Sequence, residues 1–78
     1  MELIAEVTKV VTYDKEKGFW FAITKPLEIR DEKKGSITFT GRQEVWSSPK
    51  PPPLKSLVLL KEIYETRKGL RANFAEFA

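Results

Sequence analysis

Turn-forming residues interrupt this 78-residue sequence at short intervals, and their spacing constrains the fold more than any other feature. "DKEKG" at 14–18, "DEKKG" at 31–35 and "TRKG" at 66–69 each combine glycine with charged or polar residues that favour tight turns. A longer break, "GRQEVWSSPKPPPLKS" at 41–56, holds four of the five prolines, which have no backbone N–H to donate. Every regular element must therefore be short, and we expect 41–56 to form a long loop with polyproline character.

The segments before the long loop have the composition of β-strands. Leu3–Tyr13 is rich in β-branched residues, Phe19–Thr24 in aromatic and β-branched residues, and Ser36–Thr40 alternates apolar with polar residues. Pro26 cannot donate to a β-ladder, so we expect it at an edge or a bulge, with the alternation resuming over Leu27–Arg30.

The segment after the long loop permits two interpretations. Residues 56–68 read either as a helix that Gly69 ends, or as a strand at Leu57–Glu65 followed by a turn and a fifth strand at Leu70–Phe77. Its Val, Ile and Tyr favour a strand and its Leu, Lys and Glu favour a helix, and so short an apolar run has no decisive period. The chain, 1–78, is thus expected to be one domain, either a small five-stranded antiparallel barrel or an α+β fold.

The composition argues against most catalytic and metal chemistry. The sequence has no histidine and no cysteine, so the commonest general base, the commonest metal ligands and the thiol nucleophile are missing. Its glycines are too scattered for a phosphate-binding loop. We therefore expect no enzyme activity, no cofactor and no metal. The absence of a secretion signal and of an apolar run near the ~20 residues that cross a bilayer predicts a cytoplasmic location.

The charges point to a class of partner. The formal net charge is +3, and the stretch 33–55 holds five basic residues against one acid, Glu44. Three further basic residues, Arg67, Lys68 and Arg71, lie close together near the end. A basic surface with interleaved aromatic residues is typical of nucleic-acid binding.

The run "KGFWFA" at 17–22 offers such aromatic residues. On a strand, Phe19 and Phe21 share one face and Trp20 takes the other. We expect Phe19 and Phe21 to face outward, since an exposed aromatic pair can stack on bases while nearby lysines contact phosphates. Trp20 then faces the interior.

The same run resembles a known family motif. Lys17-Gly18-Phe19-Trp20-Phe21 is similar to K-G-F-G-F, the first RNA-binding motif of the cold-shock domain, and it follows one strand and a short turn as in that family. The preceding "VVTYDKE" resembles the family's lead-in, with Tyr13 at a phenylalanine position, and "RKGLRANF" at 67–74 resembles its final hairpin. The resemblance implies a five-stranded OB-type barrel that binds single-stranded RNA or DNA, and it favours strands over a helix at 56–68.

The sequence departs from that family at several positions. Thr38, Thr40 and Gly41 stand where the second motif, V-F-V-H-F, has exposed rings, and Trp20 replaces a glycine. Trp46 lies in the loop where the family carries another aromatic residue. It is either an additional stacking surface or a side chain that packs down to hold the loop.

These features predict a binding protein with a defined set of contacts. Stacking on bases is expected from Tyr13, Phe19 and Phe21, with Trp46 as a candidate addition, and phosphate contacts from Lys9, Lys17, Arg42 and Lys68. The alternative is a protein-interaction module on the same barrel, in which the altered third strand and the proline-rich loop serve a protein partner or self-association.

Overall fold

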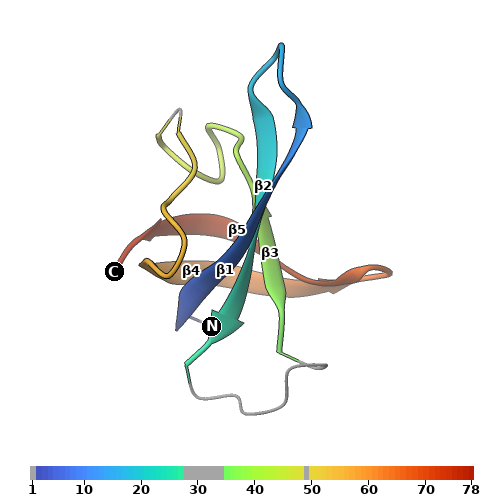
Figure 1. The fold of residues 1–78 in the computed structure, drawn as a ribbon. Helices are drawn as coiled ribbons and strands as arrows, with labels where there is room; N and C mark the ends of the chain where they lie inside the picture. The colour runs from blue at the N-terminus through green and yellow to red at the C-terminus, as the bar shows by residue number, and fades with distance from the viewer. Residues whose placement is uncertain (1, 28–34, 49) are drawn as a thin grey trace.

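The β-branched and aromatic segments form strands, and the breaks between them form turns or loops (Figure 1). The computed structural model describes residues 2–27, 35–48 and 50–78. Its strands are β1 (Glu2–Asp14), β2 (Phe19–Pro26), β3 (Ile37–Thr40), β4 (Leu57–Thr66) and β5 (Gly69–Phe77). No helix occurs within these described ranges, so the all-β prediction is confirmed and the alternative helix at 56–68 is wrong.

The strands close into a barrel in the order β1-β2-β3-β5-β4, and β4 pairs back to β1. Four of the five pairings are antiparallel, but β3 and β5 run parallel. The prediction of a wholly antiparallel barrel is corrected at this pair, because a ring with an odd number of strands cannot reverse direction at every step. The architecture is that of a small OB-type barrel.

The long strand β1 serves two partners. It pairs with β4 through Glu2–Glu6 and with β2 through Ala5–Asp14. A register shift between Val7 and Lys9 separates the two parts of the β1–β2 ladder, and such bulges bend a strand. The outer part of the β1–β2 hairpin consequently projects from the barrel (Figure 1).

Alternation along β2 separates an inner from an outer face. Trp20, Ala22 and Thr24 are buried, whereas Phe19 and Phe21 lie on the other face. The buried Thr24 hydroxyl donates a hydrogen bond of 2.7 Å to the carbonyl of β3 residue 37. The most deeply buried apolar side chains elsewhere in the barrel are Ala5, Val7, Ile37, Phe39, Val58 and Leu60.

The loop at 41–56 lies against the barrel at both of its ends. Near its start, the carbonyl of Val45 accepts a hydrogen bond of 2.9 Å from the N–H of Ala75 in β5. Near its end, the N–H of Lys55 donates to the carbonyl of Val7 at 2.8 Å. The predicted long connection is therefore present and is fixed to the barrel by backbone hydrogen bonds.

The predictions around Pro26 are tested only in part. Pro26 is the last residue of β2, where it is buried and pairs with Ala5. The predicted turn at 31–35 and the predicted continuation of the strand at 27–30 fall mostly on residues 28–34, which lie outside the described ranges.

Candidate nucleic-acid interface

The turn between β1 and β2 positions the aromatic run. The Asp14 carboxylate accepts hydrogen bonds from the backbone N–H groups of Glu16 and Lys17, both at 3.1 Å. Gly18 completes the turn with a φ of 69°, which a residue with a side chain rarely adopts. This local geometry starts β2 at Phe19 and sends its side chain outward.

Three rings then form an aromatic triad, Tyr13, Phe19 and Phe21, on the outer face of the hairpin. The Tyr13 ring stacks on Phe19 with centroids 5.7 Å apart and on Phe21 with centroids 6.1 Å apart, at interplanar angles of 20° and 30°. A register shift between Thr12 and Asp14 places Tyr13 there. Tyr13 is 50% exposed and Phe19 39% exposed, while Phe21 is half-buried, so the triad presents ring surface to solvent.

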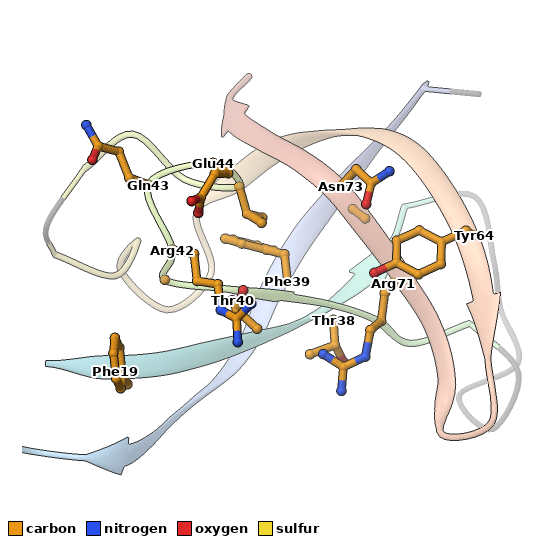
Figure 2. Close-up of a pocket in the computed structure, with 13 residues that line it drawn as sticks. Phe19, Thr38, Phe39, Thr40, Arg42, Gln43, Glu44, Tyr64, Arg71 and Asn73 are labelled. Atoms are coloured by element: carbon orange, nitrogen blue, oxygen red, sulfur yellow. The ribbon is translucent and has the colours of Figure 1, made fainter. Parts of the chain in front are cut away.

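A groove of about 810 Å³ begins beside the triad and crosses the barrel (Figure 2). Phe19 lies at one end and Tyr64 at the other, with Thr38 and Thr40 of β3 between them. The start of the long loop, residues 41–45, forms one wall, and Arg71, Ala72 and Asn73 of β5 contribute to the rest.

Tyr64 and Arg71 reach this groove because β4 and β5 change face midway. Glu62 has a φ of 52°, in the left-handed region that side-chain-bearing residues seldom occupy. Leu60 before it is buried, and after it Ile63, rather than Glu62, packs against the core. The shift directs Tyr64 outward beside Arg71, its partner in the β4–β5 register.

Tyr64 and Arg71 are groove residues that the sequence prediction did not include. A period-two pattern continued from Leu60 would have turned Tyr64 into the core. The available signal was the spacing of the buried alanines in β5, since Ala72 and Ala75 are three residues apart instead of two.

The groove carries unbalanced positive charge. Within the described residues, the side chains of Arg42 and Arg71 form no ion pair and no hydrogen bond, and Glu44 is the acidic residue that lines the groove. Away from the groove, an ion pair joins Lys61 to Glu76 at 2.9 Å. The hydrogen bond to the Glu76 carboxylate, together with its negative charge, raises the pKa of Lys61.

The predicted phosphate-binding residues are spread over the surface. Lys9 lies on β1 opposite Ile23, on the same outer face as Phe21, and Lys17 lies in the β1–β2 turn. Arg42 lines the groove. Lys68 lies in the β4–β5 turn, on a different hairpin from Lys9 and Lys17, and it does not line the groove with Arg42.

Trp46 does not provide an additional stacking surface. It is 3% exposed, and its indole N–H donates a hydrogen bond of 2.9 Å to the carbonyl of Lys50 within the loop. Its ring contacts Phe39 and Phe77, with centroids 5.5 and 4.9 Å away. The loop-packing interpretation is correct, because burying the indole against the barrel end satisfies both its apolar area and its N–H.

Trp20 faces the interior, as predicted, and Gly41 makes room for it. The Trp20 side chain is 3% exposed and meets Phe39 edge to face, with centroids 6.0 Å apart. A Cβ atom on Gly41 would overlap the Cε2, Nε1 and Cδ2 atoms of the indole. The large side chain of Trp20 on β2 is thus matched by a glycine directly after β3. Trp20, Phe39 and Trp46 together form the inner aromatic cluster.

Comparison with models of protein families, with curated proteins and with solved structures finds no significant match. No three histidine, cysteine, aspartate or glutamate side chains gather into a possible metal site in the described ranges. Across those ranges there is also no helix with the length and hydrophobicity that crossing a membrane requires.

Proposed function

We propose that this protein binds single-stranded nucleic acid, RNA or DNA, without catalysis and with little sequence specificity. The observation that supports it best is the aromatic triad, which presents partly exposed rings on the outer face of β1 and β2. Stacking on an aromatic side chain contributes about 1–3 kcal/mol per base and tolerates any base, since every base has a π-face.

The surroundings of the triad fit this proposal. Lys9 and Lys17 lie on the same hairpin, and Arg42 lines the adjacent groove, whereas Lys68 lies apart from them on the β4–β5 hairpin. Basic side chains of this kind track the phosphates and make the affinity fall with salt. In OB-type barrels, oligonucleotides bind on the face of the second and third strands and the adjoining loops, where the triad and the groove lie here.

The experiment is a titration of a fluorescently labelled single-stranded oligonucleotide at low and moderate salt, with intrinsic protein fluorescence recorded in parallel. Saturable binding that weakens with salt is expected, and Phe19→Ala should lower the affinity about tenfold. Phe74→Ala is the matched control, because Phe74 is 47% exposed but does not line the groove. Absence of binding at micromolar protein and low salt would refute the proposal.

A second candidate function, a protein-interaction module, is favoured by a different surface. Ile4, Leu57 and Phe74, on β1, β4 and β5, are 47%, 43% and 47% exposed. Ile4 pairs with Leu59, which adds to the apolar area. Clustered exposed apolar side chains are typical of protein contacts. Sedimentation over a wide concentration range tests self-association: a dimer that Ile4→Glu dissociates would support it, and a monomer throughout would exclude it.

A further inference from the structure

The groove has a chemistry different from that of the triad. Its floor on β3 carries outward-facing hydroxyl groups, from Thr38 and Thr40, while the β3 ring that borders it, Phe39, is buried. Two guanidinium groups, from Arg42 and Arg71, stand beside them without an ion-pair partner among the described residues. Hydroxyl and guanidinium donors are the groups that bind phosphate oxygens.

The strand registers place these groups on two neighbouring rows of the same outer face. In one row Thr38 of β3 pairs with Arg71 of β5, and Arg71 pairs with Tyr64 of β4. In the next row, two residues further along β3, Thr40 pairs with Phe21 of β2. Paired residues point to the same face, so the two rows together lead from β2 over β3 and β5 to β4. The three strand spacings between β2 and β4 correspond to about 14 Å. Figure 2 shows both guanidinium groups on the same side of β3, between Phe19 and Tyr64.

We propose that this groove binds the phosphodiester backbone of a strand whose bases stack on the triad at one end and on Tyr64 at the other. The inference rests on the proposed function and adds to it the course of the strand across the barrel. Tyr64 is 43% exposed and supplies the second ring. Thr38 and Thr40 hold the backbone between the triad and Tyr64.

The charge balance of the groove supports a short stretch of backbone, with one phosphate beside each arginine, rather than a long anionic tract. Arg42 and Arg71 supply two positive charges and Glu44 one negative charge among the residues that line it. Arg71 is half-buried, so its uncompensated charge is partly desolvated and gains most from an anionic ligand. Glu44 disfavours any further phosphate beside it.

The test compares salt dependence among charge-matched variants with a labelled oligothymidylate. Arg71→Gln and Arg42→Gln should each reduce the slope of log affinity against log salt by about 0.7. At low salt each should lower the affinity about tenfold. Lys50→Gln removes the same charge from an exposed residue that does not line the groove, and it should leave the slope nearly unchanged. Tyr64→Ala should weaken binding with the slope unchanged, whereas Tyr64→Phe should bind normally.

A neutral methylphosphonate oligothymidylate separates backbone from base contacts. Its residual binding should be insensitive to Arg71→Gln but still sensitive to Phe19→Ala. Thermal unfolding of each variant checks that the fold is retained. If Arg71→Gln behaves like Lys50→Gln while Phe19→Ala still weakens binding, the groove inference is overturned and the proposed function stands. If the wild-type protein binds no oligonucleotide, both fail. Displacement of the oligonucleotide by poly-glutamate at equal charge would assign the groove to acidic peptides instead.

Discussion

The inner aromatic cluster and the aromatic triad use the same kinds of side chain on opposite faces of one sheet. The inner rings are 1–3% exposed and meet edge to face or tilted, at 78° and 39°. The triad rings stack within 30° of parallel and remain partly exposed. The contrast shows that ring content alone assigns no role. The alternation of side chains along the strand decides whether a ring is buried or exposed, because the adjacent residues Phe19 and Trp20 belong to different clusters.

The largest expected effect lies in the inner cluster. Trp46→Ala removes a buried indole between Phe39 and Phe77 and should lower the free energy of unfolding by about 3–5 kcal/mol. Urea denaturation followed by circular dichroism measures it, with Trp46→Phe as the milder control. A loss below about 1 kcal/mol would mean that the loop does not hold Trp46 in the core.

Gly41→Ala tests the match between Trp20 and the glycine beside it. The new methyl group would collide with the indole, so we expect a loss of about 1–3 kcal/mol of stability. In a double-mutant cycle with Trp20→Phe the penalty should shrink, since the smaller ring leaves space. Equal penalties in both backgrounds would contradict direct contact. Gly18→Ala, where nothing lies within 4 Å of an added Cβ, provides a comparison that reports backbone strain alone.

In the triad, Tyr13→Ala should affect binding rather than stability, in contrast to the substitutions in the inner cluster. The ring is half exposed, so stability should change little, while oligonucleotide affinity falls by about 1–3 kcal/mol. Thermal unfolding and fluorescence anisotropy on the same protein preparation separate the two effects. A variant that loses stability but keeps its affinity would place Tyr13 with the structural rings instead.

The smallest expected effect concerns Glu62, whose left-handed backbone lets β4 change which of its side chains face the core. Glu62→Gly relieves the left-handed backbone but makes the unfolded chain more flexible, so we expect a net gain of about 0.5 kcal/mol. Glu62→Val, which is β-branched, should instead destabilise the protein. If both variants are equivalent in chemical denaturation, the left-handed conformation does not persist in solution.

Turn residues and period-two alternation are local signals, and they predicted the first three strands and both faces of β2. They left a strand and a helix open at 56–68, where only the family resemblance favoured strands. Three features could not be predicted from local signals. The burial of Trp46 depends on a barrel end that no local pattern describes. The outward direction of Tyr64 and Arg71 depends on Glu62, a residue type with no preference for left-handed backbone. The parallel pairing of β3 with β5 follows from ring closure, which is a property of the whole chain.

That ring closure also has a consequence for the order of events during synthesis. β5 lies between β3 and β4 in the barrel, although it is the last strand of this sequence. The hairpin of β1 and β2 can form while the ribosome is still producing the rest, so the triad can assemble early. Trp20 of β2 and Phe39 of β3, which face the barrel interior, stay exposed to solvent until β4 and β5 emerge from the ribosome. A nascent chain stalled before residue 57 would therefore expose both the triad and the future interior of the barrel to solvent, and chaperones bind such exposed apolar surface.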